Sequence, residues 1–359
     1  MPNKYQTKSD DTLNTVDKTV IGAINEVNTE LAEVKQSVSN GKSLIASAIT
    51  DKGVTTSSDA SFQTMADNIR LIQTSNNVPP WAEIYDTWIS GRSLSAQGMY
   101  TSAVANGKIY IMGGNSNTNY QLNECYDPLT NRWTSKTSIP TSRHSASASS
   151  INDKIYIVGG LPILKTNECY DPLTNTWTTK ANMRHGRLDL VTEVVDNQMY
   201  AIGGNGAGYD DCNECYNPLT NTWTDKSSMI TARYALASCV IDNKIYCIGG
   251  FNSSEDLSMI EVYDTSTDAW TTITYLLTPR RYATASAVDN NIYVIGGYYG
   301  NNALNLNECY SLSALSWKTK TPMPTVRYGL TSEMIDNKIY VFGGISTDGN
   351  SDVNEIYIS

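Results

Sequence analysis

The sequence predicts an all-β ring of six four-stranded sheets, preceded by a helical segment of different character. Two observations support the ring. A Gly-Gly pair recurs six times at spacings of 44 to 47 residues, with a Tyr three residues before each pair. A second Tyr follows each pair, and in five of the six units a Trp stands seven residues after it. An internal period of this length is typical of proteins built from repeated supersecondary units.

Each unit carries the signals of four short strands, here named a, b, c and d. Strand b is apolar at nearly every position, as in 155–158, and such a strand is expected in a sheet covered on both faces. A turn dipeptide such as Asn152-Asp153 precedes it, because Asn and Asp tolerate a positive φ. Strands c and d carry the second Tyr and the Trp. We expect the glycines to leave room for the Tyr and Trp of the neighbouring sheet.

The sixth unit has no strand d, because the sequence ends at Ser359 before its Trp is reached. The missing strand is predicted at the start of the repeat region. Trp88 lies 45 residues before Trp133 and therefore keeps the register of the repeat. We expect this N-terminal strand to complete the last sheet and close the ring, which removes an exposed sheet edge.

The order Tyr-x-x-Gly-Gly, Tyr, Trp over residues 81–359 resembles the kelch repeat, and the resemblance implies a six-bladed kelch-type β-propeller. The b–c loops differ in every unit, whereas the a–b and c–d turns are repeated. Variable loops rich in Asn, Ser, Asp, Gly and Tyr are typical of recognition surfaces. We therefore expect the binding site on the face that carries these loops, the upper face; free drift of surface loops is the alternative.

An Arg stands thirteen residues before the strand-b Tyr in four units, and Arg281 fits the fifth with one residue deleted in its turn. This Arg matches a kelch consensus position, where it either binds a ligand or ties one blade to the next. The resemblance also implies that residues just after this Arg and just after Gly-Gly line the channel mouth. The candidate ligand-binding residues on the upper face are Arg143, His144, Arg187, Arg233, Tyr234, Phe251, Arg281, Tyr282, Tyr298, Tyr299, Arg327, Tyr328, Asn115 and Asn205.

These residue types suit a saccharide. Aromatic rings stack on sugar faces, Asn bonds to hydroxyl groups, and Arg binds carboxylate or phosphate. The formal net charge of the chain is −10. We therefore expect an anionic wall polymer to be repelled everywhere except at this arginine-lined mouth.

The first eighty residues have a helical period. Apolar residues at 20, 24, 27, 31, 34 and 38 alternate in steps of four and three, and Ile45 continues this a/d heptad seam. β-Branched residues at both a and d favour a trimer; an amphipathic helix packed on its own domain is the alternative. A second short helix is predicted at about 59–72. The predicted divisions are a helical tail-attachment and oligomerisation region at 1–73, a linker at 74–80 and the propeller at 81–359.

Residues 15–26 resemble a segment common in phage tail-fibre proteins. Residues 41–54 and 62–66 are similar to tail proteins of Gram-positive phages and prophages. With the kelch repeats, this resemblance implies a tail fibre or receptor-binding protein of a phage or phage-like particle, made in the bacterial cytoplasm. It would be a homotrimer that attaches to tail or baseplate proteins and binds a host cell-surface polysaccharide or wall polymer. The alternatives are a kelch protein–protein interaction adaptor and a glycan-processing or sialic-acid-handling propeller enzyme.

Other classes are not expected. The negative charge argues against nucleic-acid binding. No apolar run approaches the roughly 20 residues that span a bilayer, and the polar start lacks the apolar core of a signal peptide. No cofactor or metal is predicted. Cys212 and Cys215 form one Cys-x-x-Cys without a second pair, and Asp348, Asn350 and Asp352 lack the rest of a calcium loop.

We expect a binding protein and not an enzyme. The two histidines, His144 and His185, are not paired with a candidate Cys, so a copper radical site is not indicated. Glu193 and Glu333 lie on strand a of opposed units, six residues after an Arg. They are candidate catalytic acids, and pairing with the ring of arginines is the alternative.

Overall fold

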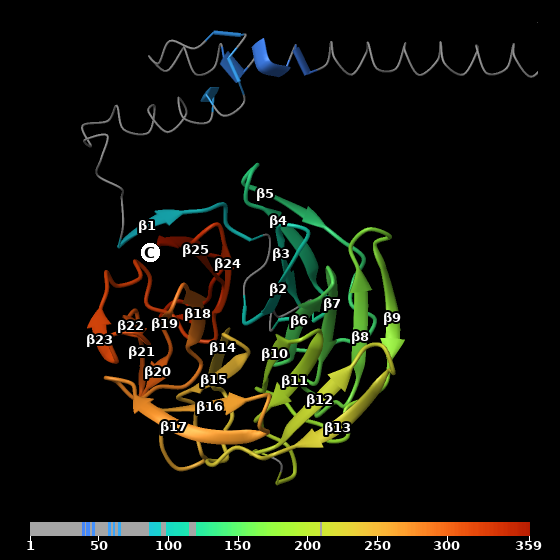
Figure 1. Ribbon diagram of the computed structural model, residues 1–359, viewed down its shortest axis with the longest axis vertical. Coiled ribbons are helices and arrows are strands. Elements are labelled where there is room, and N and C mark those ends of the chain that lie inside the picture. The colour runs from blue at the N-terminus through green and yellow to red at the C-terminus, as the bar shows by residue number, and fades with distance from the viewer. Residues whose placement is uncertain are drawn as a thin grey trace, which may run out of the picture. The chain divides into compact units, whose positions relative to one another are not determined.

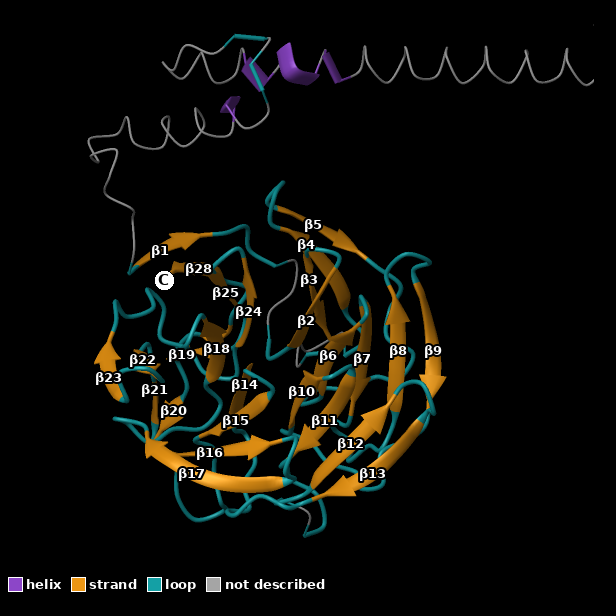
Figure 2. Cartoon of the chain, viewed as in Figure 1, coloured by secondary structure: helices purple, strands orange, loops and turns teal. Residues whose placement is uncertain are grey.

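Six four-stranded antiparallel sheets form a ring in the part of the chain that the structure describes (Figures 1 and 2). The computed structural model describes residues 86–94, 98–114, 120–208 and 210–359, and before them 38–39, 41–43, 45–46, 57–58, 60–61 and 64–65. Two compact units divide the chain, Met1–Glu83 and Ile84–Ser359. The innermost strands of neighbouring sheets touch all the way round the ring. The predicted all-β six-bladed propeller is confirmed.

In blades one to five the strands follow chain order from the channel outward. Blade one is β2 (Thr101–Ala105), β3 (Lys108–Met112), β4 (Asn123–Asp127) and β5 (Arg132–Ser135). Blade two is β6 (Ser147–Ile151), β7 (Lys154–Val158), β8 (Asn167–Asp171) and β9 (Thr176–Lys180). Blade three is β10 (Val191–Val195), β11 (Gln198–Ile202), β12 (Asn213–Asn217) and β13 (Thr222–Lys226).

Blade four is β14 (Ala237–Ile241), β15 (Lys244–Ile248), β16 (Met259–Asp264) and β17 (Ala269–Tyr275). Blade five is β18 (Thr284–Val288), β19 (Asn291–Ile295), β22 (Asn307–Ser311) and β23 (Ser316–Thr319). Blade six is β24 (Thr331–Ile335), β25 (Lys338–Phe342), β28 (Asn354–Ile358) and β1 (Thr87–Ser90). Two small hairpins lie in b–c loops, β20 (Tyr298–Tyr299) with β21 (Asn302–Ala303) and β26 (Ile345–Ser346) with β27 (Gly349–Asn350).

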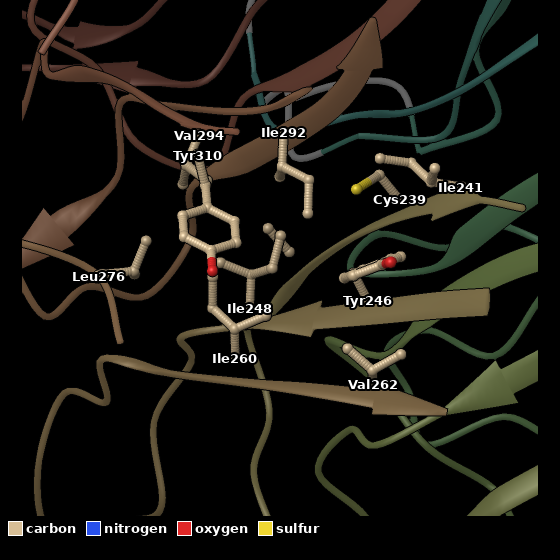
Figure 3. Close-up of a cluster of buried hydrophobic side chains, with 11 residues drawn as sticks. Cys239, Ile241, Tyr246, Ile248, Ile260, Val262, Leu276, Ile292, Val294 and Tyr310 are labelled. Carbon is tan, nitrogen blue, oxygen red and sulfur yellow. The ribbon is translucent and has the colours of Figure 1, made fainter. Parts of the chain in front are cut away.

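The apolar core of the propeller lies between neighbouring blades. One cluster of buried side chains fills each of the six interfaces in the described ring. Figure 3 shows the cluster between blades four and five, where Ile248 and Ile260 meet Ile292 and Tyr310. Burying one such side chain contributes about 1.5–3 kcal/mol. Strand b is therefore apolar on both sides because each of its faces meets a different interface.

In every blade except blade five, the repeated Tyr and Trp tie the blade to the preceding one at the outer edge. In blade two, the Trp177 indole N–H donates to the carbonyl oxygen of Thr137 at 2.8 Å. Asn175 Oδ1 accepts from the Thr137 backbone N–H at 2.9 Å and from the Tyr170 hydroxyl at 2.7 Å. Asn175 has φ 55°, in the left-handed region that Asn and Asp enter more readily than other side chains. The indole bond recurs from Trp88, Trp133, Trp223 and Trp270.

The strand β1 closes the ring. Trp88 pairs with Tyr357 of β28, and their ring centroids lie 5.1 Å apart. The Trp88 indole donates to the Thr321 carbonyl oxygen at 2.9 Å, and the Tyr357 hydroxyl donates to Asp86 Oδ1 at 2.6 Å. The chain therefore joins its first and last described strands in one sheet, beside the C-terminus marked in Figure 1.

The Gly-Gly pairs have a different role from the one expected. Gly159 and Gly160 have φ values of 69° and 106°, and a Cβ on Gly159 would lie 2.5 Å from the carbonyl oxygen of Arg187 in the next blade. The Gly160 N–H donates to that same oxygen at 2.9 Å. The expectation that the neighbour's Tyr and Trp fill this space is wrong, because backbone of the next blade occupies it.

The unit that precedes the propeller is described only at separate residues. Its residues 38–39, 41–43, 45–46 and 64–65 have helical backbone. Val38 and Ile45, two residues of the predicted seam, are 46% and 38% exposed. The rest of the seam and the linker 74–80 lie outside the described residues, so the coiled coil and the trimer stay predictions. No helix in the described residues combines the length and apolar character needed to cross a bilayer.

We expect Trp88→Ala to lower the free energy of unfolding by about 3 kcal/mol, because it removes the contact with Tyr357 and the bond to Thr321. Denaturant unfolding of the full chain measures this. Leu129→Ala is the control and should have no effect, since Leu129 is 92% exposed.

Deleting residues 1–90 should destabilise the propeller more than deleting residues 1–78, because only the longer deletion removes β1. Equal stabilities of the two truncated proteins would contradict closure by β1.

Candidate functional site

The upper face of the propeller carries the b–c loops and the connections from each strand d to the next strand a. Isolated backbone bridges join these two segments in blades two to six. They pair His144 with Leu161, Leu188 with Asn205, Tyr234 with Phe251, Arg281 with Tyr298, and Tyr328 with Ile345. The residue after the repeat Arg and the residue after Gly-Gly therefore lie side by side at the mouth of the channel.

The repeat arginines lie beneath this surface. Each is buried, at 0 or 1% exposure, and pairs with the Glu of strand c in its own blade; they are Arg143, Arg187, Arg233, Arg280 and Arg327. In blade three, Arg187 Nη2 donates to Glu214 Oε2 at 2.8 Å, and its Nη1 donates to the Gly203 carbonyl oxygen at 2.7 Å. The prediction that Arg143, Arg187, Arg233 and Arg327 bind a ligand is corrected, because these side chains have no exposed surface and serve as ties within each blade.

Blade five requires a correction of one residue. Arg280, and not Arg281, occupies the repeat position: it lies thirteen residues before Tyr293 and pairs with Glu308. No deletion in the turn is needed. Arg281 is therefore the following residue, at the position of Tyr234 and Tyr328 in their blades. Its side chain is part of the mouth.

Five residues form a continuous arc at the mouth across blades four to six, here called the aromatic arc: Tyr234, Phe251, Arg281, Tyr298 and Tyr328. The ring centroids of Tyr234 and Phe251 are 5.7 Å apart, and those of Tyr298 and Tyr328 are 4.9 Å apart. The Arg281 guanidinium carbon lies between them, 4.4 Å from the Phe251 centroid and 5.1 Å from the Tyr298 centroid. Cation–π and edge contacts of this kind orient the rings. All five side chains are half-buried, so each keeps part of its surface open.

An acidic residue neutralises the cation of the arc. Arg281 Nη1 pairs with Asp256 Oδ1 at 2.8 Å, and the Gly300 backbone N–H donates to Asp256 Oδ2 at 3.0 Å. No sequence signal marks this contact, because Asp256 is one of many acids in variable loops and its spacing to Arg281 belongs to no period. The arc thus carries no net charge from this pair.

Below the arc the channel narrows to a neck with a cavity of about 110 Å³. Its residues Ser145, Asp189, Ala235, Tyr282 and Gly329 all have positive φ. Backbone bonds of 2.8–2.9 Å link each of these residues to the next, from the N–H of one to the carbonyl oxygen of the preceding one. The Tyr282 hydroxyl donates to Asp189 Oδ2 at 3.2 Å, from blade five to blade three. Burial raises the pKa of Asp189, and this bond opposes the rise. In the neck, these backbone bonds run through blades two to six beneath the arc.

A channel cavity of about 480 Å³ is lined by the six innermost strands. Glu193 and Glu333 face it, and each accepts a hydroxyl bond: Ser238 Oγ donates to Glu193 Oε1 at 2.6 Å, and Ser102 Oγ donates to Glu333 Oε1 at 2.7 Å. The expected alternative, pairing with the arginines, is wrong, because those pair with the strand-c glutamates. Burial raises the pKa of Glu193 and of Glu333 to about 7, and the charge of Glu193 adds to the rise at Glu333. Both carboxyl groups can exchange protons near neutral pH.

The remaining predicted residues are spread around the rim. His144 in blade two contacts the ring of Tyr120, with centroids 5.6 Å apart, and Tyr120 was not predicted. Asn205 is exposed beside Leu188, and Tyr299 is 46% exposed next to the arc. Asn115 lies outside the described residues.

One group of potential metal ligands occurs in the described chain, formed by His185, Glu214 and Asp225. Glu214 already pairs with Arg187, and Asp225 pairs with Arg184 at 2.7 Å. Two guanidinium groups beside these carboxylates disfavour a cation there. Burial raises the pKa of Cys212 to about 11, which keeps the thiol of the Cys-x-x-Cys protonated and unsuited to metal binding.

Comparison with known proteins agrees with the fold. The family model of the Attractin/LZTR1 β-propeller matches residues 109–321. The solved structure of YjhT superposes with a TM-score of 0.67, over 74% of this chain and 95% of YjhT, at 15% identity. At that identity the likeness concerns the fold alone. No curated protein matches the chain in sequence.

We expect Arg187→Gln to lower the free energy of unfolding by about 3–5 kcal/mol, because it leaves the buried Glu214 carboxylate without its counter-charge. Arg184→Gln is the matched control. It breaks an ion pair with Asp225 whose side chains are 52% and 54% exposed, and should cost less than about 1 kcal/mol. Chemical unfolding compares the two. Equal losses would show that Arg187 is no more of a structural tie than Arg184.

The channel carboxyl groups should make stability depend on pH. Their pKa is about 7 in the folded chain, against 4.5 for a glutamate in water, so the folded state holds protons that the unfolded state has lost. The two protonated carboxyl groups therefore contribute to the free energy of unfolding. This contribution is complete below pH 4.5 and is lost as pH rises through 7. The double variant Glu193→Gln/Glu333→Gln should therefore gain stability relative to wild type across this range, measured as the melting temperature at each pH. Glu255→Gln, at an exposed site, should show no such gain.

Proposed function

The chain belongs to the Attractin/LZTR1 β-propeller family, and from this premise and the geometry of its upper face we propose that it is a receptor-binding protein on the tail of a phage or phage-like particle. Its propeller binds a polysaccharide or wall polymer of the host cell surface. Its N-terminal region forms a homotrimer and attaches to tail or baseplate proteins.

The aromatic arc is the observation that carries this proposal. Half-exposed rings from three neighbouring blades are held in fixed orientation by contacts between Phe251, Arg281 and Tyr298. Rigid aromatic side chains offer a large apolar surface at low conformational cost, and the tyrosine hydroxyls add hydrogen bonds at the ring edges. A chain of pyranose rings presents the matching alternation of apolar faces and hydroxyl edges.

The path of the chain through the propeller agrees with a role at the tip of a tail. Thr87 of β1 pairs with Ile358, and Ile358 pairs with Lys338 beside the a–b turn of blade six. The a–b turns lie on the lower face, opposite the arc. The polypeptide therefore enters the propeller from below, and a receptor is able to approach the arc from above without meeting the point of attachment.

The N-terminal unit supplies the attachment in this proposal. Its sequence resembles tail proteins over roughly residues 11–73. Val38 and Ile45, both a positions of the heptad seam, keep 46% and 38% of their surface exposed in a single chain. A parallel helix from a second and a third copy would cover them.

We expect Tyr234→Ala, Tyr298→Ala and Tyr328→Ala each to weaken binding of the full-length protein to host cells about tenfold, since a stacked ring contributes about 1.4 kcal/mol. Binding to whole cells and to their purified wall polysaccharide measures this. The melting temperature of each variant should stay close to wild type, because the rings lie at the surface of the mouth.

The matched controls change the opposite face. Leu129→Ser and Leu173→Ser alter exposed turns of the lower face and should leave cell binding unchanged. If these controls prevent binding while the three tyrosines are dispensable, the binding face is assigned wrongly. Capture of a host protein without binding to polysaccharide would favour the alternative of a protein-interaction adaptor.

A further inference from the structure

We propose that the saccharide recognised at the aromatic arc is uncharged, an inference that rests on the proposed function and names the ligand class of that site. The sequence predicted an arginine-lined mouth, the one place where an anionic wall polymer would not be repelled. The contacts of each arginine near the mouth remove the basis for that expectation.

Five of the six arginines near the mouth are unavailable to a ligand. Arg143, Arg187, Arg233, Arg280 and Arg327 are buried, and each forms an ion pair with a glutamate carboxylate. A phosphate or carboxylate above the arc therefore faces no unpaired guanidinium from this set. To reach a buried guanidinium group, an anionic ligand would have to break an arginine–glutamate ion pair, which costs several kcal/mol.

The sixth arginine, Arg281, is half-buried and already holds an anion. Asp256 pairs with it at 2.8 Å, and only 7% of the Asp256 side chain is exposed. The Gly300 N–H fixes the second oxygen of the same carboxylate at 3.0 Å. An anionic ligand would have to displace Asp256 or approach it against like-charge repulsion.

The loops around the arc add to this repulsion. The b–c loops of blades four, five and six, at 251–259, 298–306 and 345–353, contain four acidic residues and no Lys or Arg. A cationic ligand is disfavoured for a different reason. The Arg281 guanidinium already occupies the space against the Phe251 and Tyr298 rings, so an amine there would meet a like charge.

What remains suits a neutral sugar. Tyr234, Tyr298 and Tyr328 offer ring surface and hydroxyl groups, and the guanidinium of Arg281 has donors beyond the one directed at Asp256. Donors of this kind bind sugar hydroxyl or acetamido oxygens without requiring a charge on the ligand. In this role Arg281 holds the neighbouring rings in place and donates hydrogen bonds, while Asp256 cancels its charge.

The test uses the full-length protein on immobilised oligosaccharides. Neutral hexose and N-acetylhexosamine oligomers are compared with oligomers that carry uronate, sialate or glycerol phosphate, and with amine-bearing oligomers. We expect binding to neutral oligomers only, with less than about a twofold change in affinity between roughly 50 and 500 mM NaCl, because screening has little effect on a contact without ligand charge. Asp256→Asn should gain at least about tenfold in affinity for the acidic oligomers, and this gain should disappear in high salt.

Glu255→Gln is the matched control for that variant. It removes one exposed charge from the same loop without touching Arg281, and it should gain no acidic-oligomer binding. Preferential binding of wild type to acidic or to amine-bearing oligomers overturns the inference and leaves the proposed function intact. Absence of binding to every oligomer, together with cell binding that survives Tyr298→Ala, overturns the proposed function and the inference with it.

Discussion

The upper mouth depends on the buried arginine–glutamate pair that lies behind the Gly-Gly turn in each of blades two to six. Removing two charges from water costs several kcal/mol per ion, and the cost is offset only when the geometry is good and the remaining N–H groups find acceptors. Arg143 meets this condition: its Nη2 donates to Glu168, its Nη1 donates to the carbonyl oxygens of Gly159 and Thr166, and its Nε donates to that of Thr141. Because each such arginine is fixed, the residue that follows it is fixed as well. The aromatic arc is therefore presented on backbone that is ordered before any ligand arrives, which lowers the entropic cost of binding.

The closed ring was predictable because its signals are local and occur six times. Tyr, Gly-Gly, Tyr and Trp fix the strands of each unit, and the register of Trp88 identifies β1 as the outermost strand of blade six. The role of the glycines was not predictable in the same way. The carbonyl oxygen that excludes a side chain at Gly159 comes from Arg187 in the next blade. The sequence repeat describes one blade and does not reveal which atoms of the next blade contact it. Blade five has two adjacent arginines, Arg280 and Arg281, and either could be taken for the repeat arginine. The spacing of thirteen residues to Tyr293 shows that Arg280 occupies the repeat position.

The candidate site was predictable in position but not in charge. Repeat spacing placed the residues after the Arg and after Gly-Gly on one face, and backbone bridges join them there. Spacing does not show which carboxylate an arginine meets. The strand-c glutamates, of which Glu168 is one, face the arginines, whereas Glu193 continues along strand a into the channel and accepts a bond from Ser238. The electrostatic character of the mouth therefore became clear only from the contacts, because the arginines expected to line the mouth are buried against glutamates.

The junction of blades four and five shows how the site and the fold share one set of contacts. Blade five has Leu315 where other blades have Asn or Asp at the left-handed turn position, and the Trp317 indole nitrogen has no hydrogen-bond partner among the described residues. The outer tie that joins other neighbouring blades is missing here. At the upper face, Asp256 of blade four pairs with Arg281 and accepts from Gly300, both of which belong to blade five. The contact that neutralises the mouth thus also joins the two blades that lack the outer tie. The ion pair between Asp256 and Arg281 therefore both joins blades four and five and leaves the aromatic arc without net charge.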